Sequence, residues 1–183
     1  MNAVGSLQRF FVRQRHKRGF GVHSPFGYYF ITKIIAEGHY GYYCYPRLNV
    51  LARKSGESAR HLRLLMRIST FLADGHICTV GASQARISAL TAGDSSRRVY
   101  TFDEYRGVSS APFIYIAEPA LFQGHLGDFA AERATVIIER CDTPEGRALL
   151  QSAAPLGMTF AGRRMAVVVI HQGLPSQLIR VAL

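Results

Sequence analysis

The stretch HICTVGASQARISAL, from His76 to Leu90, decides the fold of this chain. Its β-prone apolar residues run into Gly81, and helical periodicity resumes after two small residues, Ala82 and Ser83. This order predicts a strand, a glycine turn and a helix. Such a glycine lets the backbone approach a ligand, and the helix N-terminus offers free N–H groups. Gly81, Ala82 and Ser83 are therefore candidate ligand-binding residues, with an ordinary strand–helix turn as the alternative.

A second predicted strand carries acidic residues to the same edge of the sheet. RVYTF, residues 98–102, is followed at once by Asp103 and Glu104. An acid about twenty residues after the glycine turn can accept hydrogen bonds from ribose hydroxyls. Asp103 and Glu104 are thus candidate cofactor-binding residues. The alternative is that both are solvated loop acids.

Later segments continue the alternation of strands and helices. ATVII, residues 134–138, is a buried strand that ends at Glu139, and residues 164–171 form another strand after a helix that begins at Pro144. Residues 113–117 predict either a short strand or a shortened helix, residues 120–129 a strand and turn, and residues 176–183 the first turns of a helix. The alternation predicts an α/β fold with a mainly parallel sheet covered on both faces.

The residues before this unit predict a helical, basic extension. Ser24 is a good N-cap, Pro25 suits the first helical position, and Gly38 is placed to end the helix. We expect an ordered loop at residues 39–46 and a connection at residues 54–58. The chain is accordingly divided into a basic helical N-terminal extension, residues 1–57, and a main domain, residues 58–183. In the first helix of that domain, the periodicity predicts that the arginines lie on the outer face: Arg60, Arg63 and Arg67.

All the excess positive charge lies in the first third of the chain. The net charge is +10, and residues 1–67 hold twelve Lys and Arg against two acids, whereas residues 68–183 are balanced. This asymmetry predicts a surface for nucleic acid, an acidic protein or anionic lipid. Clustered tyrosines in HYGYYCYP, residues 39–46, could stack on bases there. The alternatives are a solubilising face and tyrosines that cover a core edge.

Composition narrows the class of protein further. The chain of 183 residues is long enough for one full core. It contains no apolar run of membrane-spanning length and no signal-peptide pattern. Its three cysteines, Cys44, Cys78 and Cys141, lack metal-ligand spacing, which predicts a reducing, cytoplasmic location and no metal site.

Taken together, these motifs resemble the class I S-adenosylmethionine-dependent methyltransferases. More narrowly, the chain looks like small bacterial members with a basic start and a GVHSPF-type motif, which stands here at residues 21–26. The resemblance covers roughly residues 9 to 180. It implies a Rossmann-like sheet with S-adenosylmethionine over the first two strand ends. Residues 81–83 would lie against its methionine part and Asp103 or Glu104 against its ribose.

Several positions depart from the family pattern. Thr79 and Ala85 replace the acid and the second glycine of E-x-G-x-x-x-G, and His171 with Gln172 replace paired acids. The usual closing β-hairpin is expected to be missing, which would leave the C-terminal part incomplete and a strand edge open to a second copy of the chain. Glu139 would either face a substrate or form a surface ion pair with Arg140 or another neighbour.

Two functions therefore follow from the sequence. The first is methyl transfer from S-adenosylmethionine to an unidentified acceptor, with no catalytic residue assigned, because holding donor and acceptor in line does not always need a base. The second is a non-catalytic binding module that keeps the methyltransferase fold and uses its basic surface for nucleic acid or an acidic protein.

Overall fold

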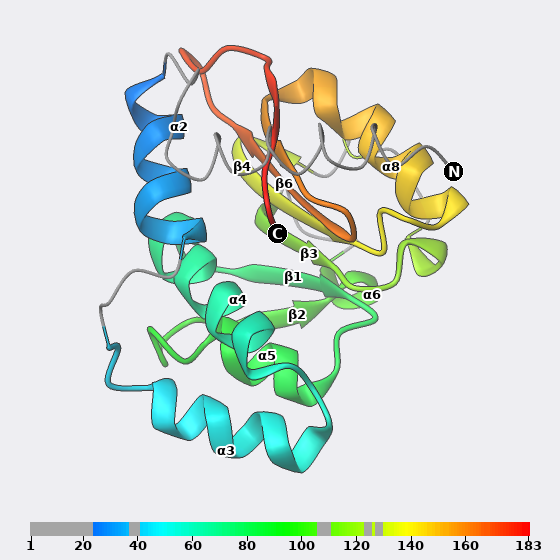
Figure 1. Ribbon diagram of the computed structural model, residues 1–183. Helices are drawn as coiled ribbons and strands as arrows, with labels where there is room; N and C mark the ends of the chain where they lie inside the picture. Colours follow the sequence, from blue (N-terminus) through cyan, green and yellow to red (C-terminus); the bar gives the residue numbers. More distant parts are fainter. Residues whose placement is uncertain (1–23, 37–40, 106–110, 123–125, 127–129) are drawn as a thin grey trace, which may run out of the picture.

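A seven-stranded mixed sheet organises the protein (Figure 1). The computed structural model describes residues 24–36, 41–105, 111–122, 126 and 130–183. The strands are β1 (Ile77–Val80), β2 (Val99–Thr101), β3 (Ala111–Ile116), β4 (Ala130–Glu139), β5 (Met158–Ala161), β6 (Met165–Ile170) and β7 (Leu178–Arg180). The helices are α2 (Pro25–Tyr29), α3 (Tyr45–Ser55), α4 (Ala59–Leu72), α5 (Gln84–Leu90), α6 (Phe102–Tyr105) and α8 (Pro144–Ala153), with a π-helix η1 (Phe30–Ile35) and the 3₁₀ turns η2 (Pro119–Leu121) and η3 (Ala154–Leu156).

The strands follow the order β2-β1-β3-β4-β6-β5-β7. The first four run parallel to one another, β6 is antiparallel to both of its neighbours, β4 and β5, and β7 is parallel to β5. The predicted α/β class with a mainly parallel sheet is confirmed. Residues 111–116 form a strand, which decides between the two interpretations of that segment in favour of the strand.

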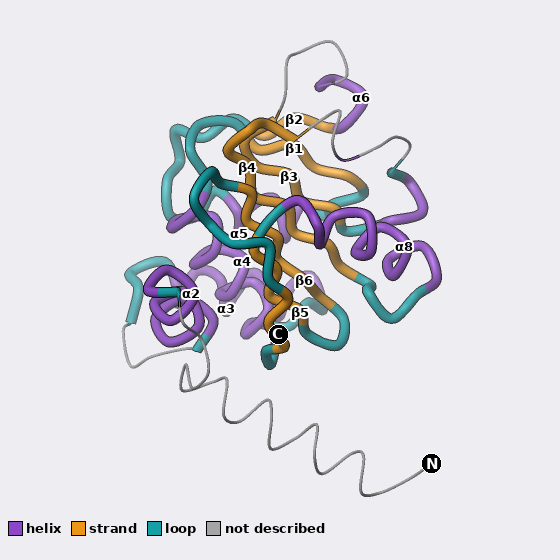
Figure 2. The backbone as a smooth tube through the Cα atoms, turned by 90° about the horizontal axis from the view of Figure 1, so that it is seen from above, coloured by secondary structure: helices purple, strands orange, loops and turns teal. Residues whose placement is uncertain are grey.

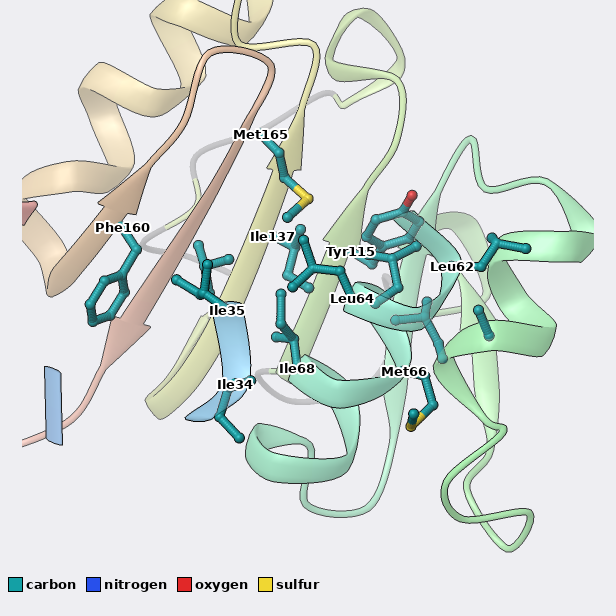
Figure 3. Packing of buried hydrophobic residues seen from close by; sticks show 14 of the residues in the cluster. Ile34, Ile35, Leu62, Leu64, Met66, Ile68, Tyr115, Ile137, Phe160 and Met165 are labelled. Carbon is teal, nitrogen blue, oxygen red and sulfur yellow. The ribbon is translucent and has the colours of Figure 1, made fainter. Parts of the chain in front are cut away.

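Helices lie on both faces of the sheet, as Figure 2 shows. α2, α3, α4 and α5 are on one side and α8 is on the other. Because both faces are covered, successive strand residues are apolar: Phe113 and Tyr115 of β3 point into one core cluster, and Ile114 and Ile116 into the other. Figure 3 shows Tyr115 and Ile137 of the sheet beside Leu64 and Ile68 of α4.

The N-terminal helices pack into the same core as the sheet. Ser24 accepts a hydrogen bond from the backbone N–H of Gly27, with Pro25 at the first helical position, as predicted. Phe30 of η1 and Leu48 of α3 are buried in the cluster that contains Phe113. The remaining residues of the basic N-terminal third, 1–23 and 37–40, lie outside the described residues, and so does Gly38.

Arg67 does not lie on the outer face of α4, so that prediction was wrong. Its side chain is buried and donates to the carbonyl oxygens of Ile34 at 2.7 Å and Ile35 at 3.4 Å, and to the Tyr45 hydroxyl at 2.8 Å. These carbonyls end the π-helix and have no partner within it, so a guanidinium with five donors satisfies them. Periodicity therefore placed Arg67 on the wrong face, because it carries no information about the need for a buried donor.

Residues 45–55 form helix α3. The helix begins inside the loop expected at residues 39–46 and ends inside the connection expected at residues 54–58. Pro46 sits in the first turn, which tolerates a missing N–H, and Gly56 ends the helix with a left-handed φ of 72°. The tyrosines of this segment differ in exposure: Tyr43 is 83% exposed, whereas Tyr45 packs against the core.

The closing hairpin that we expected to be missing is present. β5 and β6 pair in an antiparallel register from Met158↔Val169 to Ala161↔Ala166. Residues 178–180 add a further strand, β7, rather than a helix. We expected a second copy of the chain to pair with an open strand edge left by the missing hairpin. The chain's own strands occupy that edge instead, because β6 pairs with β4. Within the described ranges, no helix has the length and apolar character needed to cross a membrane.

Candidate functional site at the carboxyl ends of the strands

Gly81 turns the chain sharply at the end of β1. Its φ of 66° lies in the left-handed region that favours glycine. Ser83 then caps α5, because its hydroxyl oxygen accepts a hydrogen bond from the backbone N–H of Arg86. The same hydroxyl donates to the Glu57 carboxylate at 3.1 Å. The predicted strand, turn and helix are all present, and the turn is tied to the segment before α4.

A cavity of about 470 Å³ lies over the ends of β1 and β2, which we call the glycine-turn cavity. Its lining comprises Thr79, Val80, Gly81, Ala82, Ile87, Thr101, Phe102, Asp103 and Leu121. Three of the five candidate binding residues, Gly81, Ala82 and Asp103, thus meet at one cavity. The volume falls within the range of about 300–1,000 Å³ typical of small-molecule sites.

Ser83 and Glu104 are directed to other partners. Glu104 accepts hydrogen bonds from the backbone N–H of Thr101 at 2.7 Å and from the Thr101 hydroxyl at 2.8 Å. These two bonds hold the pKa of Glu104 below its ordinary value. Asp103 is therefore the acid that lines the cavity, whereas the Glu104 carboxylate is engaged by Thr101, the residue before α6.

Thr79 lines the glycine-turn cavity but directs its hydroxyl elsewhere. The hydroxyl donates to the Tyr100 carbonyl oxygen of β2 at 3.2 Å. The hydroxyl proton is thus engaged in a hydrogen bond within the sheet. Thr79 can therefore offer a bound ligand only its uncharged oxygen, as an acceptor.

Glu118 covers the glycine turn. A Cβ atom at Gly81 would lie 2.7 Å from both Cβ and Cγ of Glu118, closer than real side chains pack. The Glu118 carboxylate forms an ion pair with Arg140, which follows β4 and adopts an unusual positive φ of 54°. The absence of a side chain at position 81 therefore lets Glu118 pack against the turn.

Substituting Gly81 tests this packing. We expect Gly81→Ala to lower the free energy of unfolding by about 2 kcal/mol, from left-handed strain of about 1–2 kcal/mol plus displacement of Glu118. Gly56→Ala is the matched control, because Gly56 has a similar φ of 72° with open space around it. Urea unfolding of both variants measures the difference. Equal losses in the two would show that Glu118 does not press on the turn.

A buried carboxylate, Glu139, organises a second set of side chains at the same edge. One of its oxygens accepts a hydrogen bond from the Tyr115 hydroxyl at 2.5 Å and lies 2.7 Å from Nε2 of His61. Its other oxygen lies 3.0 Å from the Arg86 guanidinium. Arg86 also contacts Glu57 at 2.9 Å, so it bridges two carboxylates. We call these five residues the Glu139 network.

The network keeps Glu139 ionised. Burial alone would raise the pKa of this carboxyl, but the hydrogen bonds from His61 and Tyr115 and the charge of Arg86 outweigh it, so the pKa lies below its ordinary value. Burial and the adjacent Glu139 carboxylate raise the pKa of Tyr115, which therefore stays a hydrogen-bond donor. Glu139 is not paired with Arg140, contrary to one interpretation of the sequence, because Arg140 turns away to Glu118.

Three members of this network were not predicted from the sequence as site residues: His61, Tyr115 and Glu57. Glu139 is 78 residues from His61 along the chain. The two side chains meet only because α4 packs against the sheet. The only signal in the sequence was a polar residue in the apolar run of β3: Tyr115, which is fully buried and therefore needs an acceptor for its hydroxyl.

The Glu139 network opens onto a second cavity of about 550 Å³, which we call the polar cavity. Its lining comprises Glu57, Ser58, His61, Arg86, Glu139, Arg140, Asp142, Thr143, Arg164, Met165 and Leu183. Glu118 contacts one lining residue of each cavity, since it packs against Gly81 of the first and pairs with Arg140 of the second.

Two further findings bear on the type of site. In the described part of the chain, no three His, Cys, Asp or Glu side chains gather as metal ligands would. No family model, no curated protein and no solved structure matches this chain. A functional assignment therefore rests on the sequence resemblance and on the geometry of the two cavities.

Proposed function

We propose that the protein is a methyltransferase that binds S-adenosylmethionine in the glycine-turn cavity. The observation that carries this proposal is that Gly81 and Asp103, from the ends of two adjacent parallel strands, line the same cavity. A carboxylate there can accept hydrogen bonds from both ribose hydroxyls, and the glycine leaves the backbone accessible beside it. Ile87, Phe102 and Leu121 supply apolar surface suited to an adenine ring.

The arrangement of the sheet supports the same proposal. The resemblance implies a Rossmann-like sheet that closes with a β-hairpin, and β5 and β6 form an antiparallel pair beyond the four parallel strands. The expected loss of such a hairpin was one reason to favour a non-catalytic role. Because the chain has a hairpin, that reason no longer applies. The methyl group would pass to an acceptor held beyond the donor sulfur, and the protein's main contribution would be to align the two.

Calorimetric titration with S-adenosylmethionine and S-adenosylhomocysteine tests the cofactor site. We expect saturable binding that weakens about tenfold to a hundredfold in Asp103→Asn, because a charge-assisted hydrogen bond contributes about 1.5–3 kcal/mol. Glu104→Gln is the matched control: this neighbouring acid contacts Thr101 instead of lining the cavity, so affinity should hardly change. Absence of binding at millimolar ligand, or equal losses in both variants, would reject the site.

A second candidate function is a non-catalytic binding module for nucleic acid or an acidic protein. Four basic side chains are exposed on α3 and near the start of α4: Arg47, Arg53, Lys54 and Arg60. The Thr79 hydroxyl, used by the sheet, also favours a weakened cofactor site. Binding to labelled RNA or DNA that falls steeply with salt, through counterion release, would favour this function. Salt-insensitive or absent binding would count against nucleic acid as the partner.

A further inference from the structure

The polar cavity holds a histidine whose two ring nitrogens differ in their surroundings. Nε2 of His61 lies 2.7 Å from the Glu139 carboxylate. Within the described residues, Nδ1 has no hydrogen-bond partner, and the side chain is 24% exposed on the cavity wall. A carboxylate beside one ring nitrogen places the proton there and leaves the lone pair on the other. Nδ1 is thus an available proton acceptor.

Glu139 is held so that it can support His61 in this way. Tyr115 and Arg86 each contribute a contact to the carboxylate, and Arg86 is in turn anchored by Glu57. The carboxylate is thereby oriented and kept charged before any ligand arrives. Such an arrangement also stabilises the imidazolium that forms when a proton is accepted.

We propose that the polar cavity binds the methyl acceptor and that Nδ1 of His61 takes the proton of a phenolic hydroxyl there. This inference rests on the proposed function for its methyl donor. In the step, the hydroxyl oxygen forms a bond to the methyl carbon as the carbon–sulfur bond of the donor breaks. The sulfur keeps the electron pair of that bond, and the hydroxyl proton goes to Nδ1.

The charges of the cavity indicate an uncharged acceptor. Three arginines line it, and each is already paired with a carboxylate: Arg86 with Glu57 and Glu139, Arg140 with Glu118, and Arg164 with Asp142. An anionic ligand would have to break one of these pairs. A neutral aromatic ring fits the volume of about 550 Å³ and the apolar contact that Met165 offers.

The choice of a phenol follows from proton affinity. Proton transfer is efficient when the acid and the base are not too far apart, and a phenolic hydroxyl has a pKa of about 10. An aliphatic alcohol holds its proton far more tightly and would need a stronger base than imidazole. Glu118 lies beside a lining residue of each cavity, because it packs against Gly81 and pairs with Arg140.

The test uses 7-hydroxycoumarin, whose phenol and phenolate forms absorb at different wavelengths, without any methyl donor. Below the pKa of the free dye, adding the full-length protein should produce the phenolate band, which reports proton transfer directly. His61→Gln should abolish the band. His76→Gln is the matched control, because His76 lies at the start of β1 against the Tyr100 ring and should leave the band unchanged. Binding without the band, no binding at millimolar dye, or a band that persists in His61→Gln would overturn the proposal.

A second measurement on the unaltered protein avoids dependence on a variant that fails to fold. 7-Methoxycoumarin lacks the proton that Nδ1 would accept, and it should bind about tenfold more weakly than the hydroxyl compound. Equal affinities would also overturn the proposal. Because S-adenosylmethionine is absent from both measurements, failure of the cofactor titration and failure of the acceptor site are distinguishable.

Discussion

Replacing Glu139 with leucine should lower the free energy of unfolding by about 3–5 kcal/mol, because removing one partner of a buried ion pair leaves the others uncompensated. The Tyr115 hydroxyl is fully buried and would lose its acceptor. Arg86 would keep Glu57 but lose its second carboxylate. Urea unfolding followed by circular dichroism measures the change.

Asp142→Asn serves as the control, since Asp142 is an exposed carboxylate whose ion pair with Arg164 is also exposed. It should change stability little. A loss in Glu139→Leu as small as that of the control would mean that the Glu139 network is a solvated cluster rather than a buried one.

The contribution of Glu139 should also depend on pH. Its folded-state pKa is lowered, so its stabilisation is complete above the unfolded carboxyl pKa of about 4.3 and is lost as pH falls through the folded value. The stability difference between the natural protein and Glu139→Gln should therefore be constant near neutrality and shrink in acid. A difference that grows in acid would mean that folding raises the pKa of Glu139 instead of lowering it.

Replacing Phe160 with alanine should cost about 3–5 kcal/mol, as large-to-small changes of a buried aromatic side chain do. Phe160 of β5 is fully buried, and its ring centroid lies 4.6 Å from that of Phe30 in η1 and 6.4 Å from that of Phe26 in α2. The closing hairpin and the N-terminal helices thus share one aromatic core. Thermal and urea unfolding measure the loss.

Leu178→Ala on the neighbouring strand β7 is the control, because Leu178 is 53% exposed. Its effect should stay within about 0.5 kcal/mol, as for most surface substitutions. If Phe160→Ala unfolded only the hairpin, two transitions would appear, and the single shared core would be refuted.

Local patterns in the sequence predicted the elements that local forces decide. The cap at Ser24, the strand that ends at Gly81 and the apolar run of residues 134–138 all form as predicted. Each depends on neighbours within a few residues, through a side-chain cap, a glycine conformation or periodic apolar burial. Of the five candidate binding residues, Gly81, Ala82 and Asp103 meet at one cavity because they follow adjacent parallel strands.

The elements that were predicted wrongly depend on distant contacts. β7 is a strand because it hydrogen-bonds to β5, and no pattern in residues 178–180 carries that information. Arg67 is inside because its guanidinium donates to the carbonyls of Ile34 and Ile35, which requires η1 to lie against α4.

The sequence by itself thus determined the class of fold, the glycine turn and the acid that follows the second strand. Only the tertiary structure decided which acid lines the cavity and which residues surround Glu139. The physical reason is that hydrogen bonds between side chains act over a few ångströms, while the residues that make them are separated by up to 78 positions, as His61 and Glu139 are. Packing α4 and α5 onto the sheet brings Nε2 of His61 to 2.7 Å from the Glu139 carboxylate and creates the site.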